Sequence, residues 1–133
     1  MDKRFYRRLS LDIEGVFILD KEDAPGEFKG IIEDLSESGI KIIIDTNAYP
    51  NAYDAINEND LLYFTAADEF KLFDEDQSFI IQGKAKIIRK RVTKDALVIG
   101  GEIVSVSNEI MEYLLSRRTS IYMDSLNNKK GQR

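Results

Sequence analysis

The chain has 133 residues, and its 19 Lys and Arg against 24 Asp and Glu give a formal net charge of −5. It contains no His, Cys or Trp, which excludes Ser-His-Asp and Cys-dependent catalysis, His or thiolate metal sites, and disulfides. The length favours one domain with its own core, and 43% hydrophobic with 32% charged residues is typical of a folded globular protein.

The first half of the chain predicts three strands, at residues 9–19, 28–35 and 40–44. Pro25-Gly26 mark a turn between the first two strands. Ser36-Glu37-Ser38-Gly39 separates the second and third, which predicts a hairpin whose Gly39 takes a positive φ.

The second half predicts three more strands, at residues 61–65, 79–92 and 96–105, after an acidic loop or short turn at 45–59. Residues 66–73 fit either a strand or an irregular segment, and Asp74-Glu75-Asp76 is typical of a solvated turn. The last two strands form a hairpin, and glycines within them predict the bulges or sharp coiling of a small barrel. These glycines are Gly83, Gly100 and Gly101.

After Ser107 or Asn108 the apolar spacing becomes helical. One apolar stripe is expected to pack on the barrel, and it comprises Ile110, Met111, Tyr113, Leu114 and Leu115. The fold expected is therefore all-β, a six-stranded antiparallel barrel with a C-terminal α-helix. Its parts are a flexible basic arm at residues 1–10, the barrel and helix at 11–125, and a disordered polar tail at 126–133.

Charge is segregated along the chain. Residues 45–78 hold nine acidic side chains and one basic one, whereas residues 83–94 hold six basic side chains and no acidic one. An acidic protein can therefore present a locally basic site, which suits a small anionic ligand better than a long polyanion. For the basic strand itself, a solvated outer face is favoured over binding to nucleic acid or a membrane surface.

Two short motifs contain residue types suited to a guanine nucleotide. Arg4 and Arg8 form an Arg-x-x-x-Arg before the first strand, and guanidinium groups bind phosphate and the O6 and N7 acceptors of guanine bidentately. Asp34, Ser36 and Gly39 form an Asp-x-Ser-x-x-Gly in the first hairpin, where the carboxylate can accept from the guanine N–H groups. The alternatives are a solvated basic arm and an ordinary hairpin whose side chains bond their own backbone.

Taken together, in this order and around these strands, the two motifs resemble those of the PilZ domain. The resemblance extends to Gly83-Lys84-Ala85 and Gly100-Gly101-Glu102-Ile103, with Ile103 where the family has an aromatic residue, and to the closing helix. PilZ domains are bacterial receptors for the second messenger cyclic di-GMP. The resemblance implies a PilZ-type barrel in which Arg4 and Arg8 hold the phosphates and one edge of guanine.

By the same resemblance, Asp34, Ser36 and Gly39 line the guanine base. Lys3 and Arg7 are additional candidates for ligand contact, and Lys3 leaves open whether one ligand or a stacked pair is bound. No catalytic residue, metal site or cofactor is expected, and the ligand is cyclic di-GMP.

The function expected is a non-enzymatic, cytoplasmic receptor without a membrane span, which relays the signal to a motility, exopolysaccharide or secretion partner. One alternative is a PilZ-like barrel that acts as a protein-interaction module without binding nucleotide. Another is binding of single-stranded nucleic acid by a barrel, which the acidic total argues against.

Overall fold

A computed structural model describes residues 9–21 and 26–131 of the chain, except the side chains of residues 128–131. Residues 1–8, 22–25 and 132–133 lie outside this description. The site predictions for Lys3, Arg4, Arg7 and Arg8 fall on the first of these segments and stay predictions.

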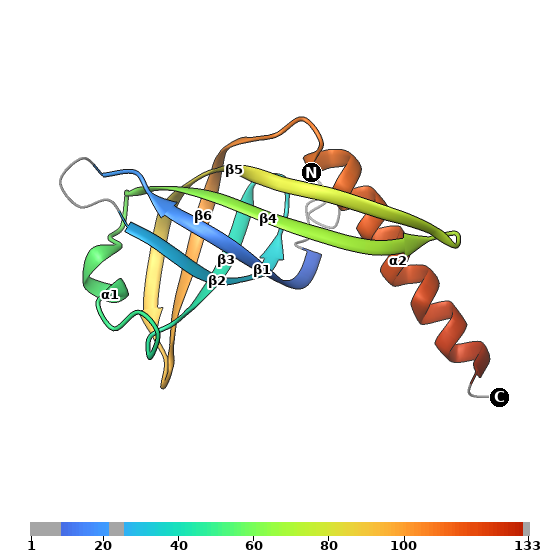
Figure 1. Cartoon of the computed structure of the whole chain (residues 1–133), viewed down its shortest axis with the longest axis horizontal. Coiled ribbons are helices and arrows are strands. Elements are labelled where there is room, and N and C mark those ends of the chain that lie inside the picture. The colour runs from blue at the N-terminus through green and yellow to red at the C-terminus, as the bar shows by residue number, and fades with distance from the viewer. Residues whose placement is uncertain (1–8, 22–25, 132–133) are drawn as a thin grey trace, which may run out of the picture.

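The described residues form six strands and two helices (Figure 1). In chain order these are β1 Leu9–Leu19, β2 Gly26–Leu35, β3 Gly39–Asp45, α1 Ala52–Ala55, β4 Leu61–Leu72, β5 Glu75–Val92, β6 Ala96–Val106 and α2 Ile110–Gly131. Every strand pair is antiparallel, and the order β1-β2-β3-β6-β5-β4 closes because β4 pairs with β1. The expected six-stranded barrel with a C-terminal helix is confirmed.

Alternation along the strands fills the barrel with apolar side chains, whose burial is the main force that stabilises the fold. On β3, Ile40, Ile42 and Ile44 are fully buried. Ile87 of β5 is also buried, whereas its neighbour Ile88 is 44% exposed. The sequence did not show which of these two adjacent isoleucines points into the barrel. In the structure it is Ile87, and a shift in the β5–β6 register follows directly after it.

Gly83 lies where β4, β5 and β6 approach closely. A Cβ atom on Gly83 would lie 2.4 Å from the carbonyl oxygen of Ser105 and 2.7 Å from the ring of Phe64. No side chain fits there, so the close approach of the strands requires glycine at this position. A register shift follows at once, between Lys84 and Ala85, as the glycines in this strand predicted.

The β4–β5 hairpin is longer than the sequence indicated. The ambiguous residues 66–73 continue β4 to Leu72, and β5 begins at Glu75 instead of at Phe79. Phe73 and Asp74 form the turn with φ values of 51° and 64°, as two-residue hairpin loops require. Residues 75–78 are largely exposed, so they lack the alternating pattern that identifies a half-buried strand.

Helix α2 packs against β4 and β5 through a buried polar cluster as well as through apolar side chains. The Tyr113 hydroxyl donates a hydrogen bond to Asp68 Oδ2 at 2.8 Å, and Arg117 Nε lies 3.1 Å from the same oxygen. The Ser120 hydroxyl donates to the Lys71 carbonyl at 2.9 Å. Asp68 is only 7% exposed, so these partners replace the hydrogen bonds that its side chain would otherwise make to water.

Two expectations for this helix need correction. Ile110, Tyr113 and Leu114 are buried as predicted, but Met111 and Leu115 are 57% and 66% exposed, since the helix contacts the barrel along a narrower face. The helix also runs to Gly131, so residues 126–131 are helical where a disordered tail was expected. Among the described residues, no helix has both the length and the apolar character needed to cross a bilayer.

Replacing Tyr113 with Phe removes the hydroxyl that bonds Asp68. We expect Tyr113→Phe to lower the free energy of unfolding by about 2 kcal/mol, because a buried carboxylate loses a donor. Urea denaturation measures this change. Tyr122→Phe is the matched control, since Tyr122 lies in the same helix at 62% exposure and its loss should change stability by less than about 0.5 kcal/mol. Equal losses in the two variants would contradict the assignment.

The same tyrosine predicts a loss of stability in alkali. Burial, and then the hydrogen bond to Asp68, raise the pKa of Tyr113 above its ordinary value of 10.0. The unfolded chain releases this proton as the pH passes about 10, while the folded chain retains it, so the free energy of unfolding falls as the pH rises further. Urea denaturation at several pH values above 9 should give a steeper fall for the wild type than for Tyr113→Phe.

Candidate functional site

The turn between β2 and β3 brings together the three residues of the Asp-x-Ser-x-x-Gly motif that the sequence singled out. Ser36 is 1% exposed, and its hydroxyl oxygen accepts hydrogen bonds from the backbone N–H of Gly39 at 3.0 Å and of Ser38 at 3.3 Å. The Ser36 N–H in turn donates to the Gly39 carbonyl at 2.9 Å. Ser36 therefore organises the turn, which is the ordinary hairpin role weighed above.

The conformation expected for Gly39 is wrong. No glycine among the described residues has a positive φ. Gly39 is buried at the start of β3, where it pairs with Glu102 of β6. The bonds from Ser36 close the turn, so a left-handed residue is not required.

Asp34 stands at one end of a row of residues that crosses four strands. It pairs with Lys41 of β3, Lys41 pairs with Gly100 of β6, and Gly100 pairs with Arg89 of β5. These residues line a pocket of about 470 Å³ on the outside of the barrel, together with Lys90, Arg91 and Val98. The pocket therefore joins the Asp34 carboxylate to the basic strand.

The cationic side chains of this pocket differ in their partners. Lys41 Nζ lies 3.4 Å from Glu33 Oε1. Lys90 is held by the segment around α1, because its amine donates to the Tyr53 carbonyl and to Asn57 Oδ1 and lies 3.8 Å from the centre of the Tyr53 ring.

Arg89 and Arg91 form no ion pair with any residue in the described part of the chain, and both are exposed. Among the charged residues of the pocket, these two guanidinium groups are therefore the ones available to an anion.

Strand β1, which follows the segment that carries Arg4 and Arg8 in the sequence, begins next to this turn. Leu9, the first described residue, pairs with Leu35, and Ser10 pairs with Asp34. Beyond this pair β1 bulges, between Ser10 and Ile13, with Asp12 at a φ of 55°. The first described residues of β1 therefore lie beside Asp34.

Sequence reasoning did not identify Lys41, Arg89 and Arg91 as residues of a pocket shared with Asp34. The basic run at residues 83–94 was a signal, but it was interpreted as a solvated face. The register shift between Ile87 and Arg89 aligns Arg89 with Gly100, and no local pattern in the sequence predicts that pairing.

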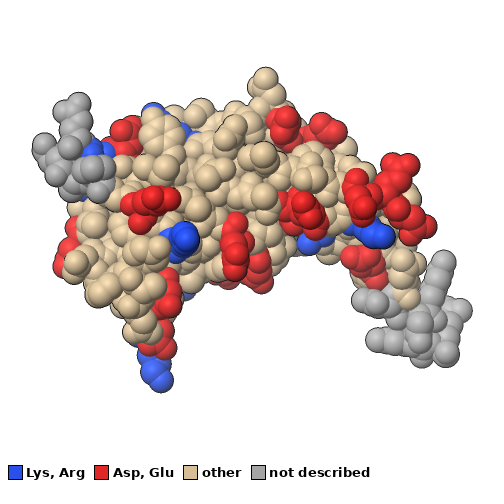
Figure 2. All heavy atoms as spheres, in the orientation of Figure 1, with Lys and Arg blue, Asp and Glu red and all other residues tan. Residues whose placement is uncertain are grey.

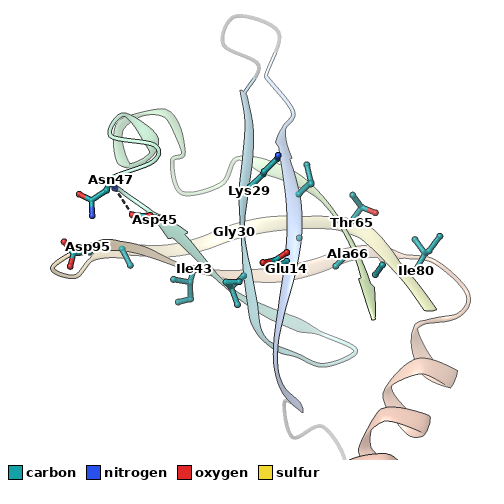
Figure 3. Close-up of a pocket in the computed structure, with 15 residues that line it drawn as sticks. Glu14, Lys29, Gly30, Ile43, Asp45, Asn47, Thr65, Ala66, Ile80 and Asp95 are labelled. Carbon is teal, nitrogen blue, oxygen red and sulfur yellow. Dashed lines mark hydrogen bonds between the residues drawn. The ribbon is translucent and has the colours of Figure 1, made fainter. Parts of the chain in front are cut away.

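A second, larger pocket of about 960 Å³ lies on the outer face of the barrel (Figure 3). Apolar side chains such as Ile43 and Ile80 line it, and Glu14, Asp45 and Asp95 are its carboxylates. Figure 2 shows a face of the molecule with more carboxylates than cations, separated by uncharged surface. This pocket holds none of the motif residues, and its charge is unsuited to an anion.

In the described part of the chain, no cluster of three or more carboxylates is placed to hold a metal ion. The small pocket is lined by one carboxylate and four cationic side chains.

Comparison with known proteins supports the fold of the chain. No protein-family model matches the chain, and no curated protein matches it. Among solved structures, the Bacillus subtilis inhibitor of motility (MotI/DgrA) aligns with a TM-score of 0.62 at 14% identity, over 96% of this chain and 53% of that one. The chain thus spans about half the length of this structural neighbour and shares its fold.

Replacing Ser36 tests its role in the turn. We expect Ser36→Ala to lower the free energy of unfolding by about 2 kcal/mol, because the N–H groups of Ser38 and Gly39 lose their acceptor. Denaturation with urea measures the loss. Ser38→Ala, which truncates an exposed serine of the same turn, should change stability by less than about 0.5 kcal/mol. A neutral Ser36→Ala would show that the hydroxyl does not hold the turn.

Proposed function

We propose that the chain is a non-enzymatic receptor for cyclic di-GMP. The observation that carries the proposal is the position of Asp34, which pairs with Ser10 at the start of β1 and lines a pocket rich in cations. Cyclic di-GMP has two guanines and two phosphates, so it needs both a carboxylate acceptor and guanidinium donors.

In this proposal each motif residue has a separate task. The Asp34 carboxylate accepts hydrogen bonds from the N1 and exocyclic amine of guanine. Arg4 and Arg8 bind the phosphates and the O6 and N7 edge of the base, with Lys3 and Arg7 as further contacts. Ser36 and Gly39 keep the turn narrow, so that the base can approach it.

The bound receptor would act on another protein, since the proposal assigns no reaction to the chain. The structural neighbour is described as an inhibitor of motility. This likeness makes motility the first process to examine, ahead of exopolysaccharide synthesis and secretion.

A second candidate is a protein-interaction module that binds no nucleotide. The large apolar pocket with its carboxylates supports it, because such a surface suits a partner with apolar and basic side chains. A pull-down of a partner protein that persists in the Arg4→Ala, Arg8→Ala double variant, and that is unaffected by cyclic di-GMP, would favour this candidate over the receptor.

Isothermal titration with cyclic di-GMP tests the receptor directly. We expect the wild type to bind, and Arg8→Ala to weaken binding by about 2 to 5 kcal/mol, because a phosphate loses its charge-assisted donors. Asp34→Asn should also weaken it, since the amide offers one acceptor where the carboxylate offers two.

The control is Lys94→Ala, which removes an equal charge in the exposed β5–β6 turn and should leave the affinity within about 2-fold. Absence of heat from the wild type at protein concentrations well above micromolar would refute the receptor. Unchanged affinity in Arg8→Ala would show that the N-terminal segment does not hold the ligand.

A further inference from the structure

We infer that Arg89 and Arg91 of β5 form a phosphate subsite, which adds to the donors of Arg4 and Arg8 and binds the half of the ligand that lies away from the guanine at Asp34. This inference rests on the proposed function, and neither sequence motif contains these residues. Its basis is the geometry of the pocket that β2, β3, β6 and β5 share.

The two arginines are presented on one surface. They are two residues apart on a strand, so their side chains leave the same face of the sheet. Both line the pocket, and β6 supplies its floor at Gly100, the partner of Arg89, and Val98, the partner of Arg91. The subsite is therefore the part of this pocket that lies over β6, with the two guanidinium groups of β5 beside it.

Gly100 makes the space in which Arg89 lies. A Cβ atom on Gly100 would lie 3.1 Å from Arg89 Cγ and 3.2 Å from Arg89 Nε. The Arg89 side chain therefore lies over the glycine instead of extending away from the barrel. A guanidinium group placed in this way is partly organised for a ligand that occupies the same pocket.

The span of the site suits a dinucleotide. Asp34 and Arg89 are three strand positions apart, and neighbouring strands lie about 4.8 Å apart, so their backbones are separated by about 14 Å or less on a curved sheet. With a guanine at Asp34, the ribose-phosphate ring of cyclic di-GMP would extend over Lys41 and Gly100 toward Arg89.

The charges favour a phosphate there. Four cationic side chains line the pocket against the single carboxylate of Asp34. Lys41 and Lys90 are engaged by Glu33 and by the segment around α1, which leaves the two arginines to bind the anion. Guanidinium groups match phosphate oxygens bidentately.

Titration calorimetry with cyclic di-GMP tests the subsite in the full chain. We expect affinity to fall about 10-fold in Arg89→Ala and about 100-fold in the Arg89→Ala, Arg91→Ala double variant, as each arginine gives up a charge-assisted contact. The dependence of affinity on salt should also weaken in the double variant. Both side chains are exposed, so the thermal unfolding midpoint should be unchanged.

The matched control is the Lys86→Ala, Lys94→Ala double variant. It removes the same charge from exposed positions of β5 and its following turn, neither of which lines the pocket. Its affinity should stay within about 2-fold of the wild type. Gly100→Val tests the subsite without a change of charge, because the new side chain would displace Arg89 and fill part of the pocket. We expect Gly100→Val to weaken binding of cyclic di-GMP, and Lys86→Ala to leave it unchanged.

The outcomes separate this inference from the proposed function. If the wild type binds cyclic di-GMP and the arginine double variant binds equally well, the subsite is refuted while the receptor stands. If the wild type does not bind cyclic di-GMP, the receptor is refuted, and pyrophosphate becomes the probe. Shifts of the Arg89 and Arg91 side-chain NMR signals on addition of pyrophosphate would then support a phosphate site, and their absence would refute it.

Discussion

The pairing register of β2, β3, β6 and β5 is the constraint on which the candidate site depends. It places Asp34, Lys41, Gly100 and Arg89 in one row, although they come from two separate hairpins of the chain. A slip of one residue would turn each side chain to the other face of its strand. Backbone hydrogen bonds and the apolar core, more than attraction among the charges, therefore determine which side chains meet there.

This arrangement explains how an acidic protein can have a pocket lined by several cationic side chains. Exposed charges of like sign repel weakly in water, so their proximity costs the fold little. The cost is reduced further because Lys41 and Lys90 have partners of their own. Salt screens the acidic side chains elsewhere on the surface, so they have little effect on the electrostatic potential inside this pocket. The potential there stays positive.

Local patterns in the sequence predicted the strands, the closing helix and the turn between β2 and β3, because each depends on residues close together in the chain. They did not predict which basic residues would face Asp34, since a register shift before Arg89 decides that. Nor did they show that Asp68 would be the buried partner of Tyr113, because the two are 45 residues apart and meet only when α2 closes on β4. The positive φ predicted for Gly39 was wrong because the Ser36 side chain closes the turn by accepting a hydrogen bond from the Gly39 N–H.

The bulge in β1 divides that strand into two mechanically different parts. Residues from Gly15 to Leu19 are bonded on both sides, to β2 and to β4, whereas Leu9 and Ser10 pair with β2 alone. Asp12 lies between them in a left-handed conformation, which breaks the continuity of the ladder. Leu9 and Ser10 are therefore held to the sheet through β2 alone, and the buried side chain of Leu9 is what also ties this end of the strand to the core.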